Sequence, residues 1–290
     1  MHVVALVKHV PDVQSARSFT AEHRLVRGGP DDSLNELDED CLEAALHLVE
    51  ATPTSSGQDD DESGDGARPT RTHRVTALTV GPPAAVGALR RALAMGATDA
   101  VHVSDEAVAG SDAVATARVV AAAVDHLHAQ HPVDLVLAGM AALDGLGSLV
   151  PSAVAALLGW PQLTLADRVQ VEPGSPGSPG GAVTVRRTTA HHVEELRAPL
   201  PAVVSVTDQA FRPRSPSLKG LLAARRTPVD VIGLADLGLA ASTAGAAGST
   251  TRVLDVQPRP ELADQVRLVA GQDGRDVAAE LADLLVERGF

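Results

Sequence analysis

The 290-residue sequence predicts a doubly wound α/β domain with a mostly parallel sheet and antiparallel strands at one edge. Strand-like and helix-like segments alternate four times in the first half of the chain, which is the pattern of βαβ crossovers. Hydrophobic residues make up 44% of the chain but aromatic residues only 1%, so the core must consist of alanine, valine and leucine. Such a core suits helices that pack on both faces of a parallel sheet.

The alternation starts with a short apolar run that is followed by a loop and an amphipathic helix. In that helix Asn35 is the expected N-cap, and acidic residues fill the first turn. Ser111 is the expected N-cap of a later, longer helix, and Gly96 ends the helix between them. The predicted strands cover residues 3–8, 74–81, 100–103 and 133–139, and the helices between them cover residues 36–51, 84–96 and 111–127.

The second half of the chain changes in texture. We expect residues 168–172, 182–187 and 200–206 to form antiparallel strands that extend one edge of the sheet, with a hairpin at residues 173–181. A basic segment that runs into a short helix follows. The expected organisation is a nucleotide-binding α/β domain over residues 1–237 with a disordered acidic insertion at 52–72, a flexible linker at 238–260 and a helical C-terminal arm at 261–290.

Charge and cysteine content exclude several functions. A formal net charge of −13 argues against a general nucleic-acid binder. The single cysteine, Cys41, cannot form an internal disulfide and has no basic activator nearby, so it reads as a small core residue. No segment reaches about 18 uninterrupted apolar residues. We therefore expect a soluble, cytoplasmic protein.

The stretch "GMAALDGLGSLV" from Gly139 to Val150 is the strongest candidate for a binding site. It lies between a predicted strand and a predicted helix, where outward N–H groups and the helix dipole favour an anion. No P-loop lysine or GxGxxG pattern accompanies it, and an ordinary glycine-rich turn explains the loop equally well. Asp144 within it reads as a turn former rather than a metal ligand or base.

Two other clusters suggest weaker sites. His191 and His192, near Glu194 and Glu195, have metal-ligand chemistry, but adjacent strand residues point to opposite faces, so a metal site is disfavoured. The basic residues between positions 212 and 226 are either a solvated surface or a docking loop for an acidic partner. The sequence shows no GxSxG, HExxH, paired CxxC or kinase-type motif, so no self-contained catalytic site is expected.

Several ordered blocks resemble the beta subunits of electron-transfer flavoproteins. They are "VKHVPD", "LNELDEDCLEAAL", "GPPAAVGALRRALAMGATDAVHV", "AGMAALDGLGSLVPSAVAALLGWPQLT", "EELRAPLPAVVSV" and "RPRSPSLKGLLAARR". The resemblance implies a Rossmann-like fold of the adenine nucleotide alpha hydrolase type. It also implies an electron carrier rather than an enzyme, in a heterodimer whose alpha subunit holds most of the FAD site and receives the C-terminal arm.

In the family, the pair takes electrons from acyl-CoA dehydrogenases of fatty acid oxidation and similar flavoenzymes and passes them to a membrane quinone oxidoreductase. The beta subunit buries a structural AMP. By resemblance, the AMP site here comprises Leu6, Asn35, Glu36, Leu37, Asp38, Val80, Gly139, Asp144, Gly145, Leu146, Gly147, Ser148, Leu149 and Val150.

The resemblance also assigns roles outside the AMP site. Val13 and Leu37 match positions near the flavin, and Glu194 matches a glutamate that holds the mobile flavin domain in its resting orientation. Leu218 matches the apolar anchor of the loop that recognises dehydrogenases, and the basic rim of that loop comprises Arg214, Lys219, Arg225 and Arg226.

Departures from the family pattern leave alternatives. Met140 and Ala141 stand where relatives carry polar residues, just ahead of the glycine-rich loop. The resemblance therefore implies that main-chain N–H groups of this loop hold AMP almost alone. A bifurcating form of the family binds a second FAD in the beta subunit; residues 147–151, "GSLVP", differ from its pattern, so AMP is favoured. A stand-alone nucleotide-binding protein of the universal-stress type, with a related architecture, is the alternative from another class.

Overall fold

The computed structural model describes residues 1–52, 73–172, 174, 180–257, 268–269 and 273–289. The expected acidic insertion, apart from Thr52, and most of the expected hairpin at 173–181 lie outside these residues. Contacts between Cα atoms divide the chain into a compact unit, Met1–Val253, and a C-terminal unit, Leu254–Phe290. Each unit is described separately.

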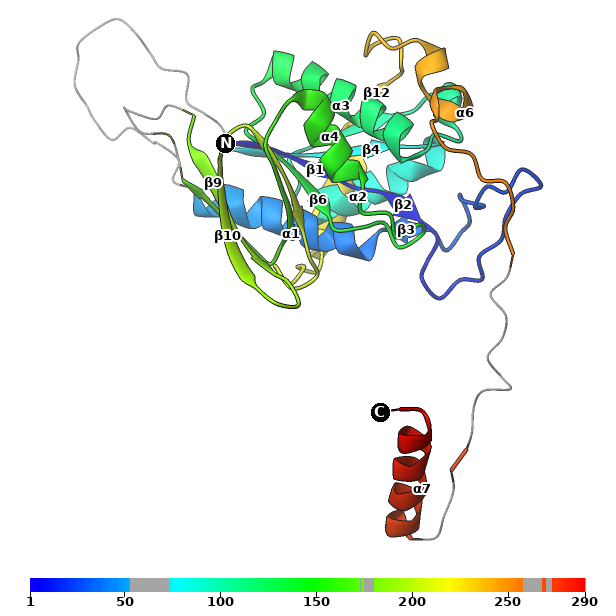
Figure 1. Cartoon of the computed structure of the whole chain (residues 1–290). Helices are drawn as coiled ribbons and strands as arrows, with labels where there is room; N and C mark the ends of the chain where they lie inside the picture. The colour runs from blue at the N-terminus through cyan, green and yellow to red at the C-terminus, as the bar shows by residue number, and fades with distance from the viewer. Residues whose placement is uncertain (53–72, 173, 175–179, 258–267, 270–272, 290) are drawn as a thin grey trace, which may run out of the picture. The chain divides into compact units, whose positions relative to one another are not determined.

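The compact unit is built on a seven-stranded sheet in which every pair of neighbouring strands is parallel (Figure 1). The predicted α/β class is confirmed. In spatial order the strands are β12 (Asp230–Ile232), β5 (Asp99–Val103), β4 (Arg74–Val80), β1 (His2–Leu6), β6 (Leu135–Gly139), β11 (Ala202–Val206) and β7 (Gln162–Ala166).

Helices cover both faces of this sheet, and each face has its own hydrophobic cluster. Along β1, Val3 and Ala5 pack toward α1 (Glu36–Ala51) and α2 (Val86–Met95), while Val4 packs toward α3 (Ala113–Gln130) and α4 (Val150–Leu158). This alternation follows from the two-residue period of a strand. Alanine-rich helix faces allow the close approach that a core almost without aromatic residues requires.

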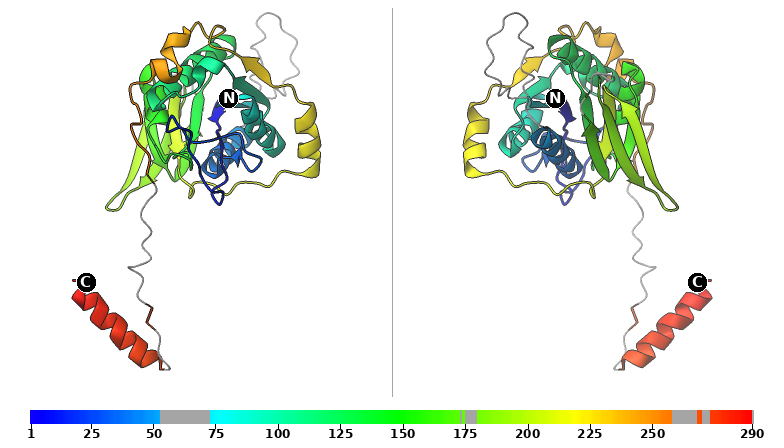
Figure 2. Two further views of the ribbon diagram at one scale, coloured as in Figure 1. Left: turned by 90° about the vertical axis from the view of Figure 1, so that its right-hand side faces the viewer. Right: turned by 90° about the vertical axis from the view of Figure 1, so that its left-hand side faces the viewer.

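A second, antiparallel sheet has the strand order β10–β9–β8 and comprises β8 (Arg168–Glu172), β9 (Ala182–Thr188) and β10 (Val193–Pro199). It lies on the opposite side of the compact unit from α5 (Leu218–Arg226) (Figure 2). The prediction that residues 200–206 join the antiparallel strands is wrong, because β11 runs parallel between β6 and β7. All five residues of β11 are buried and all but Ser205 are apolar, which is typical of an interior parallel strand.

Details of the structure correct one helix cap and the domain boundary. Asp112, not Ser111, caps α3: its carboxylate accepts the Ala115 N–H at 2.8 Å. The compact unit extends past the expected end at residue 237, because η3 (Ala241–Thr243) and α6 (Gly245–Gly248) contact α3, and Arg118 donates to the Thr243 carbonyl at 2.5 Å. The remaining short elements are β2 (His9–Val10), β3 (Ser33–Leu34), η1 (Pro83–Ala85) and η2 (Glu106–Val108).

The C-terminal unit contains one described helix, α7 (Gly274–Glu287), which begins at the N-cap Asp273. The Asp273 carboxylate accepts the Arg275 N–H at 3.0 Å. Among the described residues, no helix of the chain is both long enough and apolar enough to cross a bilayer.

Candidate functional site

The carboxyl ends of three neighbouring strands form the candidate nucleotide site. β1 lies between β4 and β6, so the first and fourth of the strands expected from the sequence are neighbours. The chain order reverses at this position, and ligands of doubly wound folds bind at such a switch point. Leu6, Val80 and Gly139, which end these strands, are therefore brought to the same edge of the sheet.

Gly139 allows the first turn of α1 to approach the end of β6. A Cβ atom at this position would lie 2.5 Å from the Asp38 Oδ1 atom and 2.5 Å from the Leu37 carbonyl oxygen. Two side-chain or backbone atoms cannot approach a Cβ so closely without displacement. Glycine at the strand end therefore brings α1 and the loop after β6 into direct contact.

Asn35 lies at the start of α1, but its role differs from the prediction. Its side chain makes no capping bond to the helix. Instead Nδ2 donates to the Ala141 carbonyl and Oδ1 accepts the Leu143 N–H, each at 3.0 Å, and the Asn35 N–H donates to the Lys8 carbonyl at 2.9 Å. Because Asn35 is fully buried, these bonds join β1, α1 and the loop after β6 in one polar network.

Asp38 is a buried carboxylic acid in this network. Its Oδ2 atom accepts a hydrogen bond of 2.8 Å from the backbone N–H of Lys8, which lies two residues after the end of β1. Burial raises the pKa of Asp38 to about 7, against the opposing effect of hydrogen bonds from Asn35 and Lys8. The side chain thus titrates near neutral pH directly under the loop.

Asp144 is held by two cations that sequence reasoning missed. Its side chain is fully covered, with Lys8 Nζ at 2.8 Å from Oδ1 and Arg27 Nη2 at 2.6 Å from Oδ2. Burial acts to raise the pKa of Asp144, but the charges and hydrogen bonds of Lys8 and Arg27 outweigh it, and the pKa is lowered. Lys8 could have been found from its place at the end of β1, the neighbour of β6. Arg27 has no local sequence signal.

Residues 145–149 form an exposed backbone segment directly before α4. The Gly145 and Leu146 N–H groups both donate to the Ala142 carbonyl, at 3.1 and 2.7 Å, and Leu146 has a left-handed φ of 50°. Within the described chain, the N–H groups of Gly147, Ser148 and Leu149 donate to no protein acceptor, and no side chain caps α4. Free N–H groups at a helix N-terminus suit an anion. We call residues 144–150 the nest.

The residues that lead into the nest are half-buried and structural. Met140 and Ala141 are partly covered, and the Ala141 carbonyl is bound by Asn35. Three further residues that the resemblance assigns to the nucleotide or flavin site lie elsewhere. Glu36 and Leu37, in the first turn of α1, are exposed and half-buried respectively, and Val13, in the loop after β2, is 50% exposed.

A second candidate surface lies on α5, where apolar and basic side chains face solvent. Leu218 is 75% exposed, and Leu221 and Leu222 are also exposed. The helix begins at Ser217, whose hydroxyl accepts the Gly220 N–H at 3.0 Å. Apolar residues that lie on one face of a helix and remain exposed to solvent are typical of an interaction surface.

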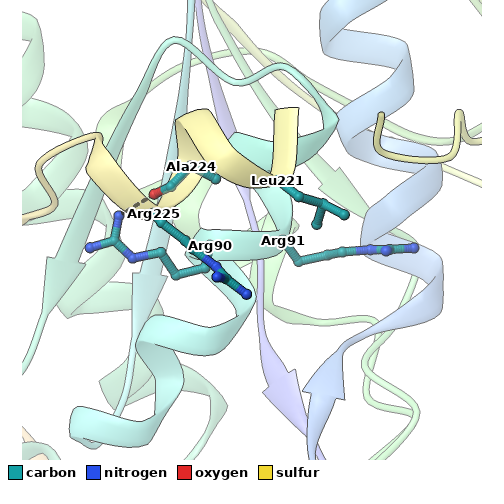
Figure 3. Close-up of a pocket in the computed structure, with 5 residues that line it drawn as sticks. All are labelled: Arg90, Arg91, Leu221, Ala224 and Arg225. Atoms are coloured by element: carbon teal, nitrogen blue, oxygen red, sulfur yellow. Dashed lines mark hydrogen bonds between the residues drawn. The ribbon is translucent and has the colours of Figure 1, made fainter. Parts of the chain in front are cut away.

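α5 is fixed to α2 by close backbone packing and by one arginine. A Cβ at Gly220 would overlap the Ala94 carbonyl, and Ala224 is buried in the contact. Arg90 of α2 donates from Nη1 to the carbonyls of Ala224 and Thr227 at 2.5 and 2.6 Å, which binds the C-terminal end of α5 (Figure 3). A pocket of about 470 Å³ lies between the helices, lined by Arg90, Arg91, Leu221, Ala224 and Arg225.

The predicted basic rim divides into two kinds of residue. Arg214 binds the carboxylates of Glu43 and Glu50 on α1, with its shortest contacts at 2.8 and 2.7 Å. These hydrogen bonds raise the pKa of Arg214. Lys219, Arg225 and Arg226 are exposed and form no ion pair among the described residues. Arg214 therefore anchors the segment, while the other three present free charge.

Comparison with known proteins decides the family. A model of the electron transfer flavoprotein domain matches residues 65–237. Electron transfer flavoprotein subunit beta of Mycobacterium leprae is 38% identical over 89% of both chains, and that of Mycobacterium tuberculosis is 37% identical over the same shares. The chain belongs to the family of electron transfer flavoprotein beta subunits.

More distant members of the electron transfer flavoprotein family match over similar lengths. The beta subunit of Megasphaera elsdenii is 30% identical over 90% of this chain and 88% of its own. Subunit CarD of the caffeyl-CoA reductase–Etf complex of Acetobacterium woodii is 28% identical over 99% of both chains. The matched family domain contains the nest, β8–β10 and α5.

In this electron transfer flavoprotein chain, Glu194 on β10 is paired within the antiparallel sheet. Arg187 of β9 donates from Nε to Glu194 Oε2 at 2.7 Å, and both side chains are half-buried. His191 and His192 lie exposed in the turn before β10, with ring centroids 6.3 Å apart. Among the residues that the structure describes, no group of three or more metal-ligating side chains converges.

Cys41 is a core residue of this chain, as the sequence predicted. Its side chain is fully buried in α1, and burial raises the pKa of the thiol well above its ordinary value. A buried neutral thiol is a poor nucleophile.

Proposed function

We propose that this chain is the beta subunit of a heterodimeric electron-transfer flavoprotein. Together with an alpha subunit it accepts electrons from acyl-CoA dehydrogenases or similar flavoenzymes and passes them to a membrane quinone oxidoreductase. The observation that carries the proposal is the match to named beta subunits over 89% of both chains, which extends well beyond a shared nucleotide-binding domain. The chain acts as an electron carrier in the cytoplasm and contributes no catalytic residue of its own.

The nest is the proposed site of a structural AMP. The free N–H groups of Gly147, Ser148 and Leu149 and the uncapped start of α4 provide donors for the phosphate. Leu6 and Val80 lie at the carboxyl ends of β1 and β4, and residues 35–38 form the first turn of α1. We place the nucleoside of AMP among these residues. Gly139 brings α1 to this site, and Asp144 orients the start of the nest.

Most residues of the proposed AMP site contribute backbone groups or hold other residues of the site in place, rather than contacting AMP with their side chains. Met140 and Ala141 offer no polar side chain, and the Asn35 amide already binds the Ala141 carbonyl, the Leu143 N–H and the Asp38 carboxyl group. The AMP phosphate is therefore held chiefly by backbone N–H groups, and AMP contributes structure rather than electron transfer.

FAD is the proposed redox group, and it supplies the electron-carrying chemistry of the complex. The alpha subunit holds most of it, and this chain completes the site with Val13 and Leu37. The exposed Val13 side chain is available for such a contact. The C-terminal arm, residues 261–290, docks on the alpha subunit, and Glu194 helps to hold the flavin domain in its resting orientation.

The α5 surface is the proposed docking site for donor dehydrogenases. Leu218 is the apolar anchor and Lys219, Arg225 and Arg226 form the basic rim, which complements an acidic partner. Arg214 acts indirectly, because its two carboxylate partners on α1 fix the segment that leads into α5.

A second candidate is a bifurcating beta subunit that binds FAD in the nest. The match to subunit CarD over 99% of both chains keeps this alternative open. Residues 147–151, "GSLVP", differ from the pattern of the bifurcating form, which favours AMP. Membership of the electron transfer flavoprotein family disfavours the stand-alone universal-stress alternative.

Co-expression tests the proposed function directly. The chain is produced with the alpha-type subunit from the same genome, and the pair is purified through a tag on one subunit. We expect a yellow 1:1 complex whose absorbance is bleached by an acyl-CoA dehydrogenase with its substrate. A folded chain that forms no complex, or a colourless complex, would contradict the proposal.

A further inference from the structure

The loop of residues 11–32, here called the N-terminal loop, is attached to the rest of the protein in an unusual way. It lies between β2 and β3, which pair with each other and close its base (dark blue in Figure 1). Most of its residues are exposed, and its backbone hydrogen bonds stay within the loop. At the same base, the Oδ2 atom of Asp32 lies 3.9 Å from the Nδ1 atom of His9.

Beyond that base, the hydrogen bonds that leave the N-terminal loop among the described residues all end on two adjacent residues. Arg17 donates to the Leu143 carbonyl at 2.8 Å. Arg27 donates from Nε and Nη2 to Asp144 Oδ2 at 2.8 and 2.6 Å. Arg24 contributes packing rather than a hydrogen bond, because its guanidinium lies against Gly110. The far end of the loop is therefore held mainly at the entrance to the nest.

Asp144 is the centre of this attachment. Its carboxylate receives Lys8 from the end of β1 on one oxygen and Arg27 from the N-terminal loop on the other. The Asp144 side chain is fully covered, whereas the side chains of Lys8 and Arg27 are 42% and 39% exposed. A covered carboxylate with two cations forms stronger contacts than an exposed ion pair, because water does not screen it fully.

The same residues fix the backbone of the nest. The Leu143 N–H is bound by Asn35 and its carbonyl by Arg17, so both of its backbone groups are occupied. Asp144 follows directly, and three residues after it come the consecutive N–H groups of Gly147, Ser148 and Leu149, which donate to no acceptor in the described chain. If residues 143–149 become more rigid or more mobile, the contacts of Leu143 and Asp144 with Arg17 and Arg27 therefore make the N-terminal loop more rigid or more mobile as well.

We propose that Asp144, through Arg27 and Lys8, is a positioning residue that couples the nucleotide nest to the N-terminal loop. A nucleotide that orders the nest also orders this loop, which carries Val13. By linkage, the loop in its attached form strengthens nucleotide binding by the same factor. The inference rests on the proposed AMP site for the identity of the ligand, but the attachment itself does not depend on it.

Hydrogen–deuterium exchange of the full-length chain tests the coupling, with AMP as the probe. The variants are Asp144→Asn and Arg27→Gln. The control is Asp31→Asn, which makes the same charge change as Asp144→Asn, within the loop, at an exposed residue that forms no ion pair among the described residues. We expect both variants to accelerate exchange at residues 16–28 by about tenfold, the effect of losing a charged hydrogen bond. We expect AMP to slow this exchange in the wild-type chain and the control but not in the variants.

Three outcomes separate the possibilities. Equal exchange in the wild-type chain and both variants would overturn the attachment. Faster exchange in the variants, with no effect of bound AMP on the wild-type loop, would overturn the coupling. Equilibrium dialysis measures AMP binding independently: if the wild-type chain binds none, the proposed AMP site fails, while the variants still decide whether Asp144 anchors the loop.

Discussion

The nest and the α5 surface present opposite parts of the chain to their ligands. The nest exposes backbone, and buried side chains behind it, chiefly those of Asn35 and Asp144, set its shape. The α5 surface exposes side chains, led by Leu218, and close backbone packing at Gly220 holds the helix behind them. The two surfaces thus reverse the roles of backbone and side chain.

This difference predicts where substitutions act. On the nest, changes to exposed side chains should be mild and changes to the buried supports severe. On α5, removal of an exposed side chain should abolish recognition and leave the fold intact. The predictions below test this contrast, from the variant that should lose most stability to the variant that should lose none.

Gly139→Ala should destabilise the protein most. The new Cβ would lie 2.5 Å from Asp38 Oδ1 and the Leu37 carbonyl, so α1 must move away from β6. We expect a loss of about 3 kcal/mol or more in the free energy of unfolding, measured by urea denaturation. Gly145→Ala is the matched control, because its Cβ would meet no atom within 4 Å. Equal stability of the two variants would refute the close approach.

Asn35→Ala should have the next largest effect. It leaves the Ala141 carbonyl and the Leu143 N–H without their partner in a buried network. We expect a loss of about 2 kcal/mol in the free energy of unfolding and a lower AMP content in the purified complex. A variant that loses stability but retains full AMP content would show that Asn35 supports the fold and not the nest.

Asp38→Asn should change how stability depends on pH. Burial raises the pKa of Asp38 from 3.8 to about 7, so between these values the folded protein holds a proton that the unfolded chain has lost. Stability from this group is therefore present below pH 4 and lost as pH rises toward 7. Relative to the wild type, Asp38→Asn should gain about 3 kcal/mol between pH 4 and 7, since the pKa is raised by about three units and each unit is worth about 1.4 kcal/mol. Urea denaturation at both pH values measures it, and a constant difference would contradict the buried acid.

Leu218→Ala should leave stability unchanged within about 0.5 kcal/mol, because the side chain is 75% exposed. We expect electron transfer from the donor dehydrogenase to slow at least about tenfold at low protein concentration, with flavin content intact. Leu146→Ala is the matched control: Leu146 is 67% exposed on the nest, which acts through its backbone. Unchanged transfer in Leu218→Ala would remove α5 from the docking site.

Local pattern was sufficient to predict most of the fold. The α/β class and the helix that begins after Asn35 both followed from periodicity. The pairing of β1 with β6 is a long-range contact that periodicity does not determine. Residues 200–206 were misassigned because an apolar run reads the same in an edge and an interior strand, and only long-range pairing places β11 between β6 and β7. Ser111 and Asp112 were both suitable caps, and the geometry at Ala115 selects Asp112.

The candidate site was predicted in outline but not in its supporting contacts. The glycine-rich loop after β6 was recognised from its position, yet its anchors come from residues more than 100 positions away, such as Asn35 and Arg27. Asn35 shows why: its identity and position suit an N-cap, and nothing local indicates that the side chain turns to the loop. Arg214 likewise looked like free charge until its pairing with Glu43 and Glu50 was seen.

The nucleotide content of the purified heterodimer tests the central claim most directly. The complex is denatured, and the released nucleotides are separated and quantified by chromatography. We predict one AMP and one FAD per heterodimer, with the AMP held by the nest. Two FAD and no AMP, or no adenine nucleotide besides a single FAD, would contradict the account.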